Sequence, residues 1–222
     1  MSKYKRREKY NKKYFEIYAM KSLEYCYDVS WKGCFIFTEE KPDLQSDILN
    51  IGIEVTSSSS SRERQINSLF NRFIEKEISY EFLKNKVDLL GGNIKQINEC
   101  TVLFHNQGMG EFHKSIENLV TIIVAKNQEK LSTYRQFSQN MLYIFTLEPL
   151  LNESDMQEVC VLLKKTLSHS ILTFDLYFIN CVNNLFVLDL ENQKIKKILI
   201  TEDMLKKIKS ESLQLSAQYY NL

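Results

Sequence analysis

The chain has 222 residues, with 29 Lys and Arg against 28 Asp and Glu, 44% hydrophobic residues and five cysteines. This length is typical of one domain with an appendage, and the composition is that of a globular protein. The longest apolar runs, residues 119–125 and 141–147, are much shorter than the roughly 18 residues that cross a bilayer. The odd number of cysteines and the absence of a CxxC pair argue against a secreted disulfide scaffold. We therefore expect a cytoplasmic protein that does not enter a membrane.

The elements predicted in the first half of the chain begin with a long amphipathic helix, because apolar residues recur there at steps of three and four. This half is predicted to contain a helix over residues 4–27, strands over 34–37 and 51–56, a helix over 62–86, a strand over 100–104 and a helix over 112–137. The strand over 51–56 has the clearest pattern, since Ile51, Ile53 and Val55 alternate with other residue types.

The second half continues the alternation of helices and strands. It is predicted to contain a strand over residues 141–147, a helix over 154–167, strands over 174–181, 185–190 and 194–200, and a last helix that Thr201 opens. The alternation indicates an α/β fold around one mixed sheet. We expect a single domain, with a basic arm (1–13), a core (14–150) and a C-terminal extension of the sheet plus a helix (151–222).

Positive charge is concentrated at the N-terminus, where residues 1–13 hold seven Lys and Arg against one Glu. A cluster of this kind can neutralise phosphates and bind nucleic acid through counterion release, although basic tails also occur as ordinary solubilising segments. The nucleic-acid contacts expected in this arm are Lys5, Arg6, Arg7 and Lys12.

Two acidic residues, Asp43 and Glu54, flank a predicted hairpin whose turn contains Asp47 and Asn50. Folding this hairpin brings the two carboxylates together across neighbouring strands. Like charges at short range repel unless a cation lies between them, and oxygen ligands suit Mg²⁺ or Mn²⁺. The simpler reading is that both are surface acids. A shared metal would instead indicate metal-assisted hydrolysis of a phosphodiester.

The segment Pro42-Asp43, followed across the hairpin by Glu54-Val55-Thr56, resembles the PD-(D/E)xK nuclease superfamily. The resemblance implies a restriction-endonuclease-like mixed central sheet flanked by helices. It also implies that Asp43, Glu54 and the main-chain carbonyl of Val55 bind the metal. Thr56 stands at the catalytic position where the family usually has a Lys, and a neutral hydroxyl supplies no charge there.

A further match lies in the first predicted helix. The segment from Glu16 to Leu23, with Gly33 beyond it, resembles the first-helix pattern of resolvase-like and Mrr-like members of the superfamily. In those proteins the Glu points at the metal site, so the resemblance implies that Glu16 supports the metal. The resemblance covers roughly residues 10–147.

Two lysines on the helix predicted over residues 112–137 could supply the missing cation. Lys126 and Lys130 continue the apolar stripe of Leu119 and Ile123 at steps of three and four residues. An inward-facing ammonium group is costly unless it meets an anion, so one of these lysines is expected to reach the acids. Alternatively, both lie beyond the sheet and extend into water.

Together these features predict a Mg²⁺-dependent endonuclease that cleaves DNA. Arg62 and Arg64, after a run of serines, are expected to add contacts to DNA. Cutting both strands of a duplex would call for a homodimer. Two alternatives stay open. One is a catalytically inactive protein of this fold that binds nucleic acid or a protein partner, and the other is an interaction module that uses the basic helix alone.

Overall fold

The computed structural model describes residues 3–58, 65–66, 69, 72–73, 76–90, 93–98, 101–105, 110–146, 151–167, 174–181 and 183–219. The chain forms two compact units. The first comprises residues 1–57 and 119–222, and the second comprises residues 58–118. Among the described residues, no helix is long and apolar enough to cross a membrane.

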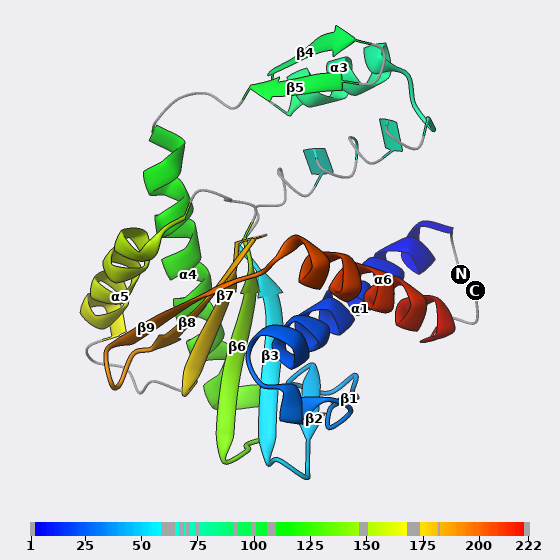
Figure 1. The fold of residues 1–222 in the computed structure, drawn as a ribbon. Coiled ribbons are helices and arrows are strands. Elements are labelled where there is room, and N and C mark those ends of the chain that lie inside the picture. The colour runs from blue at the N-terminus through cyan, green and yellow to red at the C-terminus, as the bar shows by residue number, and fades with distance from the viewer. Residues whose placement is uncertain are drawn as a thin grey trace. The chain divides into compact units, whose positions relative to one another are not determined.

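The first unit is built on a mixed seven-stranded sheet with the order β1-β2-β3-β6-β7-β8-β9 (Figure 1). Its strands are β1 (Ile36–Phe37), β2 (Leu44–Ser46), β3 (Ile51–Ser57), β6 (Gln139–Phe145), β7 (Leu176–Asn180), β8 (Asn184–Asp189) and β9 (Lys194–Leu199). The three central strands, β3, β6 and β7, run parallel, and all other neighbours are antiparallel.

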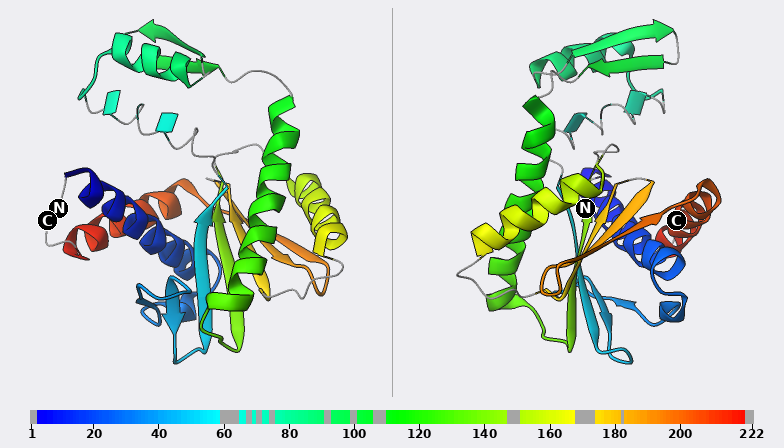
Figure 2. Two further views of the ribbon diagram at one scale, coloured as in Figure 1. Left: turned by 180° about the vertical axis from the view of Figure 1, so that it is seen from behind. Right: turned by 60° about the vertical axis from the view of Figure 1, so that its left-hand side comes forward.

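Helices cover both faces of this sheet. Helices α1 (Lys3–Cys26) and α6 (Glu202–Tyr219) pack together on one face, and α5 (Glu153–Leu167) lies on the other with α4 (Gly110–Thr133), of which residues 119–133 belong to this unit (Figures 1 and 2). A short 3₁₀ turn, Val29–Trp31, follows α1. The mixed α/β class predicted from the sequence is confirmed.

The central strands are buried on both sides, as expected for a sheet sandwiched between helices. In β6, Met141 and Tyr143 belong to the apolar cluster beneath α1 and α6. Their neighbours Leu142 and Ile144 are equally inaccessible and, by strand alternation, face the opposite helices. The same alternation in β3 sends Ile53 toward α1 and Glu54 toward α4.

The second unit has its own small core. Helix α3 (Tyr80–Leu89) and the antiparallel pair of β4 (Asn93–Asn98) and β5 (Thr101–His105) belong to it. The buried apolar side chains Ile66, Leu83, Val87 and Ile94 pack together in it. The chain passes through this unit between the parallel strands β3 and β6.

One predicted helix was wrong in extent. The helix expected over residues 62–86 does not continue through residues 76–79, because Lys76 has a φ of 58° and Ser79 is extended. The Ser79 hydroxyl accepts a hydrogen bond from the amide of Phe82, which caps a new helix, α3. Strand β4 was not predicted, since its sequence is mostly polar.

The predicted hairpin is confirmed and packs tightly against the connection between α4 and β6. Leu44 pairs with Ile53, so the next pair outward is Asp43 opposite Glu54. Gly52 in this hairpin leaves no room for a side chain, because a Cβ atom would lie 2.5 Å from a Phe137 ring carbon and 2.7 Å from Pro42 Cγ.

We therefore predict that Gly52→Ala lowers the free energy of unfolding by about 1–3 kcal/mol through overpacking. Urea denaturation of G52A, F137A and the double variant measures this effect. Because removing the ring relieves the clash, G52A should cost less in the F137A background than in the parent. Strictly additive losses would contradict the proposed contact.

Candidate functional site

The candidate site is a cluster of buried charges contributed by α1, the β2–β3 hairpin and α4. Its acids are Glu16, Asp43 and Glu54, all almost inaccessible to solvent. Isolated buried carboxylates are unfavourable, so each is expected to have a cation or hydrogen-bond donor beside it. The contacts of each acid identify those partners.

Glu54 is paired with a lysine from the helix on its side of the sheet. Lys126 Nζ lies 2.7 Å from Glu54 Oε1 and 2.9 Å from Glu129 Oε2, and it donates to the Tyr134 hydroxyl at 3.4 Å. Lys126 was one of the two helix lysines expected to reach the acids, and this contact is present. Glu129 also forms an ion pair with Lys41, so the network extends to the segment before Asp43.

The second carboxylate oxygen of Glu54, Oε2, is buried without a hydrogen-bond partner among the described residues. Burial raises the pKa of Glu54, and the negative charge of Asp43 raises it further, whereas Lys126 and the Tyr134 hydroxyl act in the opposite direction. One oxygen of Glu54 is therefore neutralised by Lys126, and the other has no hydrogen-bond partner among the described residues. The negative charge of Asp43 also acts on this carboxylate.

Asp43 is held by the backbone of the facing strand. The amide of Val55 donates to Asp43 Oδ2 at 3.0 Å, while Lys12 of α1 lies 3.2 Å from Asp43 Oδ1. Val55 thus touches the site through its N–H, and the metal-binding role expected of its carbonyl stays a prediction. The sequence resemblance did not identify this amide contact.

Glu16 is tied to two lysines of its own helix. Lys13 Nζ lies 2.6 Å from Glu16 Oε2, and Lys12 Nζ lies 3.4 Å from Glu16 Oε1. Burial raises the pKa of Glu16, and the charge of Asp43 adds to this rise against the opposing effect of the two lysines. The spacings of three and four residues from Glu16 could have indicated both lysines, but the sequence analysis assigned Lys12 only to nucleic-acid binding.

The remaining predicted residues lie further from this cluster or outside the described residues. Thr56 is half-buried on β3, two residues beyond Glu54 and on the same face. Lys130 lies one helical turn beyond Lys126, with its ammonium group 4.7 Å from the centre of the Phe174 ring. Lys5, Arg6 and Arg7 lie in α1, but their side chains are outside the described part of the chain, as are Arg62 and Arg64.

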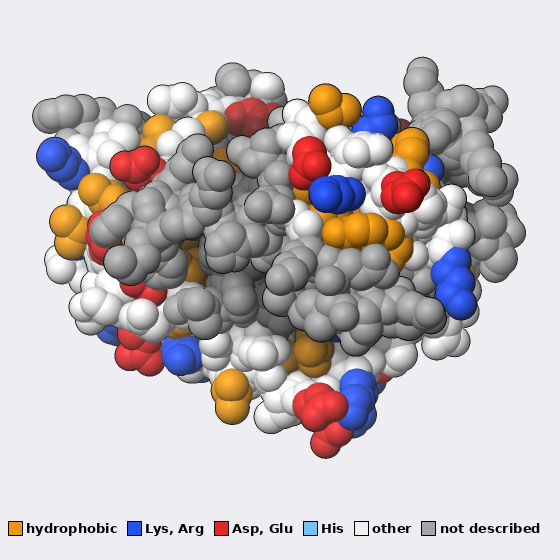
Figure 3. Space-filling view, turned by 90° about the horizontal axis from the view of Figure 1, so that it is seen from above, with side chains coloured by type: hydrophobic (Ala, Val, Ile, Leu, Met, Phe, Trp, Pro, Cys, Tyr) orange, Lys and Arg blue, Asp and Glu red, His pale blue; other side chains and the backbone are white. Residues whose placement is uncertain are grey.

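The arrangement offers hard oxygen donors and one well-placed ammonium group. Among the described residues, no group of three or more His, Cys, Asp or Glu side chains is arranged so that it could hold a metal ion. A Mg²⁺ site would therefore rest on two carboxylates, as Mg²⁺ sites commonly do. On the face drawn in Figure 3, the acidic and basic side chains of the described residues are interspersed and form no single basic patch.

Comparisons with protein-family models, with curated proteins and with solved structures find no match to this chain. The resemblance to the PD-(D/E)xK superfamily therefore stays a prediction that rests on the residues themselves.

The pairing of Lys126 with Glu54 leads to a stability prediction. Lys126→Met should lower the free energy of unfolding by about 2 kcal/mol, because it leaves the buried carboxylate without a cation. Adding Glu54→Gln removes that charge and should restore part of the loss. Denaturant titration of the parent, both single variants and the double variant gives the coupling energy, and a coupling near zero would mean that the two groups do not interact.

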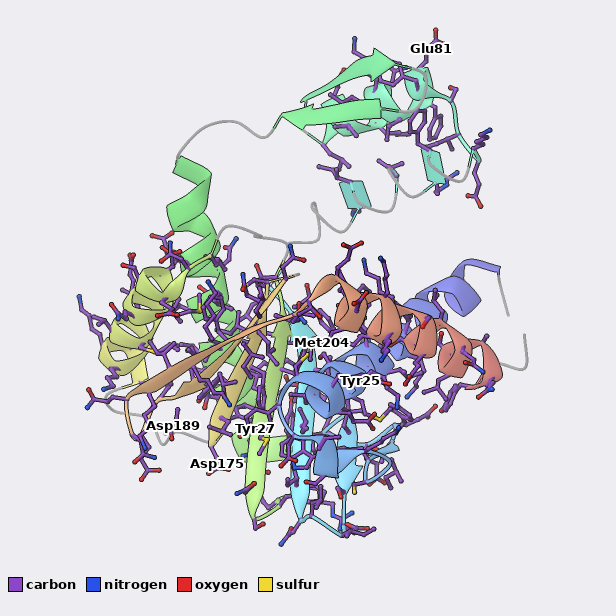
Figure 4. All side chains as sticks on the ribbon, viewed as in Figure 1. Tyr25, Tyr27, Glu81, Asp175, Asp189 and Met204 are labelled. Carbon is purple, nitrogen blue, oxygen red and sulfur yellow. The ribbon has the colours of Figure 1, made fainter. Side chains whose placement is uncertain are left out.

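Lys130 gives a pH prediction. Burial lowers its pKa to about 8, although the charge of Asp175, labelled near the start of β7 in Figure 4, acts in the opposite direction. An unfolded Lys titrates near 10.4, so between pH 8 and 10 the unfolded chain binds more protons and stability rises with pH.

In Lys130→Met this rise should be absent, and the variant should be more stable than the parent at pH 7 by about 1 kcal/mol, with the gap closing toward pH 10. Urea titrations at pH 7, 8, 9 and 10 test it. If the free energy of unfolding changes with pH in the same way in the two proteins, the lowered pKa of Lys130 is contradicted.

Proposed function

We propose that this protein is a Mg²⁺-dependent nuclease that hydrolyses phosphodiester bonds in DNA. The observation that carries the proposal is the cluster of Asp43, Glu54 and Lys126, which come from three separate segments of the chain and include a buried carboxylate oxygen without a partner. Two acids can hold a metal ion that assists phosphodiester hydrolysis, and a lysine can stabilise the negative charge that develops on the phosphate.

The residues fit a hard divalent cation. Glu54 Oε2 is directed into the protein without a hydrogen bond, and a buried carboxylate oxygen of this kind is stabilised by a cation. Asp43 lies opposite Glu54 in the hairpin, and its charge acts on Glu54. Asp43 and Glu54 would hold the ion, with Glu16 nearby in the same field. Bound there, Mg²⁺ supplies Lewis-acid polarisation of the phosphate.

Groups of the protein itself orient the metal ligand and provide a cation for the phosphate. The Val55 amide fixes the Asp43 carboxylate against β3, so that this ligand is already oriented before the substrate arrives. Lys126 is held by Glu54, Glu129 and Tyr134, which use all three of its N–H donors. Releasing the longest of these contacts, the one to Tyr134, frees a donor for an oxygen on which negative charge develops.

Lys126 would therefore take the role of the catalytic Lys of the family motif, whose position Thr56 occupies in this chain. Glu54 and Thr56 share a face of β3, and Lys126 approaches that face from α4. The Thr56 hydroxyl can donate a hydrogen bond to phosphate but cannot neutralise it. A nucleic acid is proposed as the substrate because the basic residues of 1–13 precede Glu16 in the same helix, although phosphate contacts of this kind carry no sequence information.

One observation favours a second function, in which the protein binds nucleic acid or a partner protein without cleavage. Asp43 and Glu54 already have lysine partners, Lys12 and Lys126, so the cluster is stable without a metal ion. The cleavage experiment separates the two functions.

We predict that the purified full chain nicks plasmid DNA with Mg²⁺ and that EDTA abolishes the nicking. Asp43→Asn and Glu54→Gln should each lower the rate by at least about 100-fold, and Lys126→Met by about 10- to 1000-fold. Asp47→Asn serves as a matched control, since Asp47 is an exposed acid of the same hairpin that pairs with Arg135. Agarose gels with time points measure the rates.

DNA binding without any Mg²⁺-dependent cleavage in the parent protein would favour the second function. Cleavage that Asp43→Asn and Asp47→Asn affect equally would show that Asp43 has no special part in it.

A further inference from the structure

We propose that Lys12 is a built-in counter-ion of the acidic cluster, which a divalent cation must displace before the site becomes active. The inference rests on the proposed function and concerns the regulation of the same site. Its basis is the position of one ammonium group between two buried acids from different elements. Lys12 Nζ lies 3.2 Å from Asp43 Oδ1 and 3.4 Å from Glu16 Oε1.

Lys12 differs from the two acids in its exposure. Its side chain is 71% exposed, whereas those of Asp43 and Glu16 are 8% and 4% exposed. The acids are fixed by their surroundings, and the lysine reaches them from solvent. The ammonium group of an exposed lysine is hydrated again when it leaves, so its departure costs less than that of a buried lysine.

The other two lysines of the cluster are held in place. Lys13 is buried and lies between two aromatic rings, 5.0 Å from the ring centre of Phe37 and 4.9 Å from that of Tyr219. Lys126 uses all three N–H donors within the protein. Lys12 is therefore the cation of this cluster that can leave most easily.

Charge balance connects the departure of Lys12 with the arrival of a metal ion. Three buried acids, Glu16, Asp43 and Glu54, face three lysines, so the cluster is close to neutral without any further ion. A divalent cation would add two positive charges beside the ammonium group of Lys12. Repulsion between them is relieved when Lys12 moves into solvent, so metal binding and release of Lys12 oppose each other.

The exchange also connects metal loading with the substrate. Once released, the Lys12 ammonium group is free to contact a phosphate of the nucleic acid. A phosphate that attracts Lys12 away from Asp43 and Glu16 favours metal binding, and by reciprocity the metal favours phosphate binding. The site would then hold its metal more tightly when nucleic acid is present.

The test measures Mn²⁺ binding to the full chain by titration calorimetry at low ionic strength, in the parent and in two variants. Lys12→Gln removes the competing charge and should lower the Kd for Mn²⁺ by about 3- to 10-fold. Lys12→Arg keeps a cation at the position and should bind Mn²⁺ as the parent does. Lys32→Gln controls for net charge, because Lys32 is exposed and outside the acidic cluster.

The possible results distinguish this inference from the proposed function. If K12Q binds Mn²⁺ no more tightly than the parent and K32Q, the competing role of Lys12 is wrong while the metal site stands. If neither the parent nor K12Q binds Mn²⁺, both the inference and the proposed metal site are wrong. Circular dichroism of each variant confirms folding, which K12Q should retain because its side chain is exposed.

Discussion

The ion pair between Glu54 and Lys126 is the interaction on which the site depends. Glu54 lies on a central strand with 3% of its surface exposed, where a lone carboxylate would take up a proton or disrupt the fold. The lysine that neutralises it comes from α4, beyond the second unit in sequence, so the pair ties together segments 72 residues apart. Only one oxygen of Glu54 is paired in this way, and the other oxygen has no hydrogen-bond partner among the described residues.

The connection between α4 and β6 holds the hairpin in register with this pair. The amide of Arg135 donates to the carbonyl of Lys41, and the Arg135 guanidinium group contacts Gln45. Ser138 bonds the Asn50 side chain and backbone at the hairpin turn. The same connection leaves Gly52 without room for a side chain. It also fixes the position of Asp43 along the hairpin relative to the C-terminal end of α4. Precise placement of the acid therefore comes from segments that carry no acidic ligand themselves.

The sequence indicated those parts of the site that depend on local periodicity. The alternation from Ile51 to Thr56 predicted β3 and the face of Glu54, and the helical spacing from Leu119 predicted that Lys126 turns inward. Which of the two helix lysines meets Glu54 could not be predicted, because one turn of α4 separates them and packing sets the height of the helix. Lys130 instead lies over Phe174, a residue whose position depends on the sheet as a whole. The interruption of the predicted helix at residues 76–79 follows from the Ser79 hydroxyl, which caps a new helix. The helical spacing of the apolar residues continues across this point, so it did not indicate the interruption.

The C-terminal third of the chain takes part in positioning α1, although no acid of the site comes from it. Lys21 and Tyr25 of α1 both contact Glu211 of α6, and Tyr25 is labelled beside α6 in Figure 4. Near the middle of α1, Lys13 lies against Tyr219, the last described residue of α6, and pairs with Glu16. Contacts at two levels restrict sliding and rotation of α1 against α6. Because Lys12 and Glu16 are one turn apart on α1, the same contacts set where the exchangeable ammonium group meets Asp43.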